Sequence, residues 1–476
     1  MPETLLIKFL KTLNQNEIRQ FRDFIYSPTF NKNTKIAELF ELHYKHYPEF
    51  NSGELSDNVL FENIFKDEVY QYSKIKNLIS DLFGLGKEFL AFNFFRKNQN
   101  IKEKFLLSEL RLRNLDSAFE KAFKAAEKRI ENIKKRNEEF YLHKFDLQFE
   151  IMSYYSPKKP NVNFDYLQKR LDLFIDYSAT VLLKIYNIMH HENSQNNFKF
   201  DMKMFGNVME YFKNNEIKDN PTLEIYYYIL LLETTKDEKY FYVLKDLRLK
   251  YKEKLTIFDN YMLYLHLDSY CATAFNEHCR TDLLNEQFLL VKENLMFELV
   301  GDGKILYPDF LNEVKKAVRV NQFKWAEDYI IKYKCNLTEE IDNTLNFCHG
   351  YISYKKGELE KALDYFSRTN FPNFIIKIQV KLHLLQLYID LEYYEQAILM
   401  IDSFKHYLTR ERSLIDSMKI SVFEFLKISG DLIKVKTEVL KKDKDFRMNK
   451  LKQDIENMSN NRFGIKLWLK EKIVDG

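Results

Sequence analysis

Turn-forming residues are scarce in this chain, and their scarcity limits the possible folds more than any other feature of the sequence. Glycine and proline supply 11 and 8 of the 476 residues, about 4% against the roughly 12% of an average protein. Sandwiches and barrels of short strands need a turn about every 8–12 residues. Nucleotide-binding loops need clustered glycines. The composition therefore disfavours both classes and favours a chain of long helices.

Apolar residues recur at steps of three and four along the chain, for example from Leu115 through Phe119 and Ala122 to Ile130. This spacing places them on one face of a helix. The alternation typical of β-strands never persists long enough to predict a strand. The interior prolines fall between the periodic segments, where a missing backbone N–H is tolerated. We therefore expect an all-α chain with about twenty helices.

A degenerate repeat gives the strongest internal signal. In the segment GYISYKKGELEKALDYF, the small residues Gly350 and Ala362 suit a close helix crossing, and Gly357 suits the turn between the two helices. The crossing alanines Ala326, Ala362 and Ala397 lie 36 and 35 residues apart. The pattern resembles the tetratricopeptide repeat, a helical hairpin with a period of about 34 residues.

This resemblance implies an α-solenoid of stacked helical hairpins in the C-terminal half. The repeat is degenerate, since Leu385 replaces a crossing glycine in the next unit. The N-terminal segments FRDFIYSPTFNKN and KIKNLISDLF are similar to the beginnings of uncharacterised bacterial proteins that continue into helical repeats; this similarity implies no activity. We predict an N-terminal helical domain at 1–98, a charged helical hairpin at 99–160 and a tetratricopeptide-like array at 161–476.

The resemblance also suggests where a partner binds, because the first helix of each tetratricopeptide repeat lines the concave surface of the array. The residues expected on that surface are Phe347, Tyr351, Tyr354, Lys355, Gln386 and Asp390. They form a mixed apolar and polar set, unlike the basic-and-asparagine set that clamps a peptide carboxylate in some members of the family. The sequence therefore predicts a non-enzymatic scaffold or adaptor that binds another protein or a peptide.

Charge is distributed unevenly, and this leaves an alternative function open. Residues 96–136 contain 13 basic and 6 acidic side chains, and residues 434–452 contain 8 and 3, although the whole chain carries a formal charge of only +3. A basic hairpin at 96–136 would suit a nucleic-acid-associated regulator. No recognised nucleic-acid-binding motif accompanies it, and solvated helix faces explain the same charge runs.

Motifs for catalysis or metal binding are not found in the sequence. Cys271, His278 and Cys279 lack the close pairing of zinc ligands. The segment Gly84–Lys87 has only part of a phosphate-binding loop and predicts a local break in a helix. We expect no enzymatic activity, no cofactor and no metal. An enzyme would require titratable side chains that converge from distant positions in one pocket.

The expected location is the cytoplasm. The first residues lack the basic and apolar regions of a signal peptide. The four cysteines are scattered, which favours reduced thiols over a disulfide framework. The longest apolar stretch, at 225–232, is shorter than the roughly 20 residues that span a bilayer, so no membrane insertion is expected.

Overall fold

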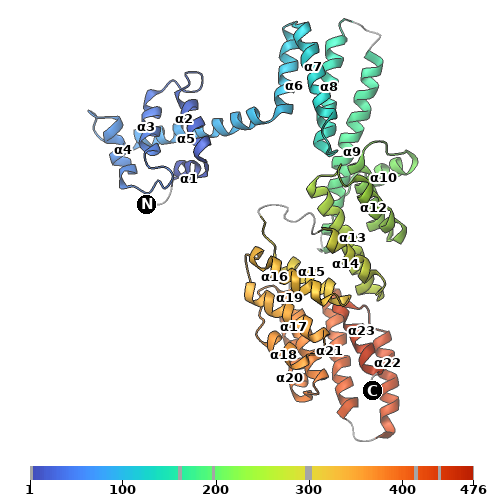
Figure 1. The fold of residues 1–476 in the computed structure, drawn as a ribbon. Helices are drawn as coiled ribbons and strands as arrows, with labels where there is room; N and C mark the ends of the chain where they lie inside the picture. Colours follow the sequence, from blue (N-terminus) through green and yellow to red (C-terminus); the bar gives the residue numbers. More distant parts are fainter. Residues whose placement is uncertain are drawn as a thin grey trace. The chain divides into compact units, whose positions relative to one another are not determined.

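The computed structural model describes residues 4–158, 163–195, 199–294, 303–411, 416–437 and 441–474. Within these ranges the chain forms 23 α-helices, with short 3-10 turns and no β-strand (Figure 1). The prediction of an all-α fold is confirmed. None of the helices described combines the length and the apolar composition needed to cross a membrane.

The chain divides into two compact units. The first comprises Met1–Ile133 and Leu142–Phe174, and the second comprises Lys134–Tyr141 and Ile175–Gly476. These boundaries differ from the sequence-based ones at residues 98 and 160. The segment expected to hold one charged hairpin contains three helices instead.

The first unit begins with a phenylalanine-rich core in which short helices pack against a long one. The Phe21 ring meets the rings of Phe9 and Phe40 edge-on, with centroid distances of 5.4 Å in both cases. Asparagine 14 starts the second helix, because its side chain accepts hydrogen bonds from the backbone N–H groups of residues 16 and 17. The helices are α1 (Leu5–Thr12), α2 (Gln15–Tyr26), α3 (Thr34–Tyr44), α4 (Asp57–Ile64) and α5 (Tyr72–Lys97), with the 3-10 turn η1 (Gly53–Leu55).

Helix α5 runs without interruption through Gly84 and Gly86, so the expected helix break at this point is wrong. A glycine is needed at position 86 because α1 and α5 approach each other closely there. A Cβ atom at this position would lie 2.5 Å from the Phe9 ring, whereas one at Gly84 would meet nothing within 4 Å. The glycine therefore allows α1 to pack against α5.

The next helices carry the basic segment and connect the two units along the chain. They are α6 (Gln99–Leu112), α7 (Asp116–Glu131), α8 (Glu138–Tyr155) and α9 (Asn163–Gln195). The boundary between the units falls within α8 and within α9, so each of these helices contributes residues to both.

The second unit has two hydrophobic cores that follow one another along the sequence. One is built from α9 to α14, and the other extends from α14 to α23. The helices of the first core, after α9, are α10 (Phe205–Asn214), α11 (Pro221–Thr235), α12 (Glu238–Tyr251), α13 (Ile257–His278) and α14 (Leu283–Asn294). Those of the second, after α14, are α15 (Tyr307–Arg319), α16 (Phe323–Tyr333), α17 (Ile341–Lys355), α18 (Leu359–Ser367), α19 (Phe374–Asp390), α20 (Tyr394–Arg410), α21 (Asp416–Thr437), α22 (Lys441–Glu456) and α23 (Ile465–Val474), with the 3-10 turns η4 (Lys334–Asn336) and η5 (Arg462–Gly464).

Small residues allow close helix contacts in the second core. A Cβ atom at Gly350 of α17 would lie 3.2 Å from the Phe366 ring of α18, so a larger residue here would require the Phe366 side chain to shift. Ala326, Ala362 and Ala397 are 0% exposed. Each helix from α17 to α22 also packs against the next one along the chain.

Candidate functional site

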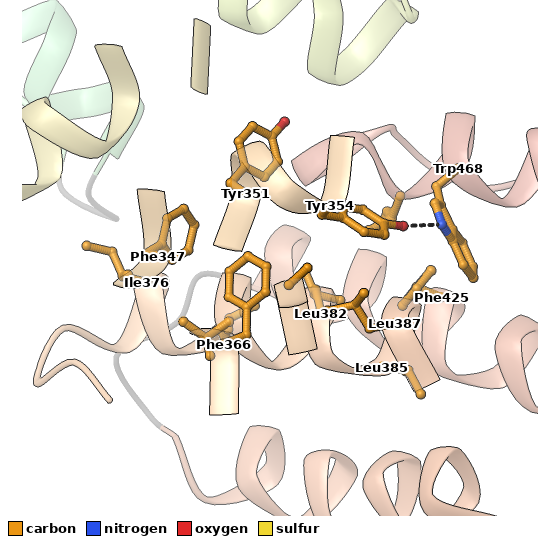
Figure 2. Close-up of a cluster of buried hydrophobic side chains, with 14 of the residues drawn as sticks. Phe347, Tyr351, Tyr354, Phe366, Ile376, Leu382, Leu385, Leu387, Phe425 and Trp468 are labelled. Atoms are coloured by element: carbon orange, nitrogen blue, oxygen red, sulfur yellow. Dashed lines mark hydrogen bonds between the residues drawn. The ribbon is translucent and has the colours of Figure 1, made fainter. Parts of the chain in front are cut away.

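Helices α17 and α19 are held face to face by an aromatic cluster around His383. The His383 ring lies 5.3 Å from the Tyr351 ring and 6.0 Å from the Tyr354 ring, measured between centroids. On its other side it stacks on Phe366 of α18. Tyr351 and Tyr354 are three residues apart and therefore share one face of α17. Figure 2 shows the Tyr351 hydroxyl pointing away from the buried cluster.

A cavity of about 490 Å³ opens beside this cluster. Its walls come from the end of α13, the start of α14, the end of α15, the facing sides of α17 and α19, and the C-terminal segment. The lining residues used below are Phe275, Arg319, Tyr351, Tyr354, Lys355, His383, Gln386, Phe463, Leu467, Trp468 and Glu471. Four of the six residues expected on a concave surface, Tyr351, Tyr354, Lys355 and Gln386, therefore lie around one cavity.

The other two expected residues do not line the cavity. Phe347 is 1% exposed, and its ring packs edge-on against Phe366 in the core. The Asp390 carboxylate accepts a hydrogen bond of 3.0 Å from the Tyr354 hydroxyl and forms an ion pair with Lys472 at 2.8 Å. Phe347 thus supports the cavity wall from behind, and Asp390 fixes the position of Tyr354.

The C-terminal segment closes one side of the cavity. The Trp468 indole N–H donates to the Tyr354 hydroxyl oxygen at 2.8 Å, as the dashed line in Figure 2 marks. Buried Asn461 donates its side-chain N–H to the Phe275 carbonyl oxygen at 3.2 Å and accepts a hydrogen bond from the Leu467 backbone N–H. The start of α23 is therefore attached to α13 on one side and to α17 on the other.

Helix α15 contributes two basic side chains next to the cavity. Lys315 and Arg319 are one helical turn apart, and both border a small cavity of about 20 Å³. This small cavity shares Arg319, Tyr351, His383, Gln386 and Phe463 with the larger one. The Lys315 ammonium donates to the Gln379 side-chain oxygen at 2.7 Å, and its interactions with the described residues include no carboxylate.

Burial and neighbouring charge shift the pKa values of Lys315 in α15 and of His383 in α19. Burial first, and then the charges of Arg319 and Lys316, lower the pKa of Lys315 to about 7. Burial also lowers the pKa of His383 to about 3, with a further contribution from nearby cations. His383 is therefore neutral at physiological pH. Its Nδ1 lies 3.0 Å from the Gln386 side-chain oxygen, which suits an Nδ1–H donor.

Sequence reasoning missed Lys315, Arg319 and Trp468 as lining residues. The basic pair had a local signal: the two side chains lie four residues apart in α15, next to the buried apolar residues Val314 and Val318. No local signal in the sequence pointed to Trp468, because its partner Tyr354 lies 114 residues earlier in the chain.

Several basic residues of the 96–136 segment bind carboxylates of their own unit. Arg129 pairs with Glu103 at 2.7 Å, and Arg111 pairs with buried Glu150 at 2.9 Å. Lys104 pairs with Asp146, also at 2.9 Å. These contacts join α6 to α7 and to α8, so part of the predicted basic excess holds helices together. Residues 134–136 belong to the second unit.

The structure places the remaining candidates from the sequence inside helices or at the end of one. Gly84–Lys87 lies inside the continuous helix α5. Cys271 is buried, and Cys279 follows the end of α13 in the left-handed conformation. In the part of the chain that the structure describes, no group of three or more His, Cys, Asp or Glu side chains is arranged to hold a metal ion.

Comparison of the chain with known protein families, with curated proteins and with solved structures gives no match. A proposal for its function therefore depends on the geometry of the cavity itself.

Proposed function

We propose that this protein is a non-enzymatic scaffold or adaptor that binds a peptide segment of another protein in the cavity beside α17 and α19. Helices α15 to α20 would act as a tetratricopeptide-like array, and the protein would work in the cytoplasm. The observation that carries the proposal is that Tyr351, Tyr354, Lys355 and Gln386 border one cavity of about 490 Å³.

The size and lining of the cavity suit a short peptide segment. Ligand sites typically measure about 300–1,000 Å³ and combine apolar walls with a few polar groups. Here Phe275, Leu467 and Trp468 supply apolar surface, while Gln386 and the exposed Lys355 supply hydrogen-bond donors. Rigid aromatic side chains lose little entropy when a partner binds, which makes them efficient contact residues.

Selection from a library of displayed random peptides, followed by fluorescence anisotropy with the selected peptides, tests this proposal. We expect a micromolar Kd for the native protein. Tyr351→Ala should weaken binding by about tenfold or more, because it removes a ring at the cavity wall. Lys355→Ala should weaken binding less, since its side chain is exposed.

Lys356→Ala is the matched control. This residue follows Lys355 directly but forms an ion pair with Glu327 at 2.6 Å and does not line the cavity. The Lys356→Ala variant should bind every selected peptide as tightly as the native protein does. Circular dichroism must show unchanged helix content for each variant. Selected peptides that bind Tyr351→Ala and the native protein equally would exclude this cavity as the binding site.

A further inference from the structure

Among the described residues, no carboxylate pairs with the α15 cations that line this cavity and the small cavity beside it. Arg319 and Lys355 line this cavity, and Arg319 also lines, together with Lys315, the adjoining cavity of about 20 Å³. The acidic residue that lines the same cavity is Glu471, which is exposed. The neighbouring groups His383 and Cys348 are neutral, because burial lowers the pKa of the imidazole and raises the pKa of the thiol.

Two other cations of the same unit that are little exposed have acidic partners. Lys316, the next residue in α15, binds Asp268 at 2.8 Å and Glu313 at 3.0 Å. Lys184 binds the fully buried Asp259 at 2.7 Å. A buried charge without a partner costs several kcal/mol, and these carboxylates offset that cost. Lys315 has no such carboxylate among the described residues.

Donor groups also remain available at this wall. An ammonium group has three N–H donors, and Lys315 directs one of them to Gln379. The Arg319 guanidinium lies over the Phe275 ring, 4.7 Å from its centroid, and no side-chain hydrogen bond to a described residue engages its five N–H donors. Oxyanions are the ligands that such paired donors bind best.

We propose that Lys315 and Arg319 form an oxyanion-binding site, which takes the acidic or phosphorylated side chain of the bound peptide. The inference rests on the proposed function for the identity of the ligand as a peptide. The oxyanion supplies the negative charge that Lys315 lacks, while the aromatic walls contact the rest of the segment. Carboxylate and phosphate share this chemistry, so both are used as probes.

The first experiment uses inorganic phosphate and succinate with the full chain at pH 6.5. Either probe should raise the urea midpoint of unfolding along a saturable curve, because a ligand that binds only the folded state stabilises it. Lys315→Met and Arg319→Met should each abolish the saturable part. Lys315→Met removes an unbalanced charge, so this variant is expected to remain folded.

Lys356→Met is the control, since this cation lies outside the cavity. It should keep the full response to both probes. Both anions also stabilise proteins in general, but that effect rises without saturation and is common to all variants. Equal responses of Lys315→Met, Lys356→Met and the native protein to both probes would overturn the proposed site. A response to only one probe would identify the oxyanion as carboxylate or phosphate.

The second experiment separates this inference from the proposed function. Selected peptides are compared with versions in which Glu is replaced by Gln, or phosphoserine by serine. We expect the neutral versions to bind about tenfold or more weakly to the native protein and no differently to Lys315→Met. Peptides that bind in the cavity with no charge preference would contradict the oxyanion site but would still support the proposed peptide-binding function. Saturable phosphate binding without any selected peptide would support the oxyanion site and contradict the proposed peptide-binding function.

Discussion

Gly86 shows how a single missing side chain shapes the first unit. Its Cα faces the Phe9 ring, which is itself held by edge-on contacts with Phe21 and Phe83. The ring therefore has little room to move. Gly86→Ala should lower the free energy of unfolding by about 1–3 kcal/mol, as overpacked cores generally do.

Gly84 provides the matched comparison at the residue scale, because it lies in the same helix with open space around it. Gly84→Ala should raise stability by about 0.5–1 kcal/mol, since alanine reduces the entropy lost on helix formation. Urea unfolding of both variants, followed by circular dichroism, gives the comparison. Stabilisation by both substitutions would show that α1 can shift away from α5.

At the scale of elements, α23 is held to α17 and α19 by a chain of polar contacts. Lys472 binds the Asp390 carboxylate, which accepts from the Tyr354 hydroxyl, which in turn accepts from Trp468. Lys472→Met would leave a carboxylate that is 6% exposed without its cation. We expect a loss of about 1–3 kcal/mol, below the value for a fully buried pair because the lysine itself is partly exposed.

Lys470→Met tests the same helix without disturbing this chain of contacts. Lys470 pairs with the exposed Glu456, and such surface pairs contribute about 0–1 kcal/mol. Thermal unfolding followed by tryptophan fluorescence reports on this region, because Trp468 is part of it. If the two lysine substitutions destabilised the protein equally, the Asp390 pair would not be what holds α23 in place.

Across the whole molecule, local patterns predicted the helices and one face of α17 and α19, but not how distant segments meet. The three-residue step from Tyr351 to Tyr354 is sufficient to place both on one side of a helix. Their meeting with Trp468 depends on packing between elements more than a hundred residues apart. The sequence also could not show that Lys315 has no carboxylate partner among the described residues, because its neighbours Cys348 and Gln379 come from α17 and α19.

Partly buried histidines link the stability of the second unit to pH. The folded state holds the pKa of His383 at about 3, and burial also lowers the pKa of His349 and of His190. An unfolded histidine has a pKa of about 6.5. Between these values the unfolded chain binds more protons than the folded one, so stability is present above about pH 6.5 and is lost as the pH falls.

His383→Phe should reduce this dependence on pH. The groups around the ring are Gln386, Lys355, Lys315 and Arg319, and the cations among them oppose its protonation. Removing the His383 imidazole should decrease the loss of stability between pH 6.5 and 5 by up to about 2 kcal/mol, because each proton contributes about 1.4 kcal/mol per pH unit.

Tryptophan fluorescence makes the measurement specific to this unit, since both tryptophans, Trp325 and Trp468, belong to it. Urea unfolding at pH 5 and pH 6.5, in buffers without phosphate, gives the two free energies. His406→Phe is the control, because the His406 side chain is exposed and its replacement disturbs no buried contact. A native protein equally stable at both pH values would mean that the His383 ring can leave its cluster and take up a proton without unfolding the second core.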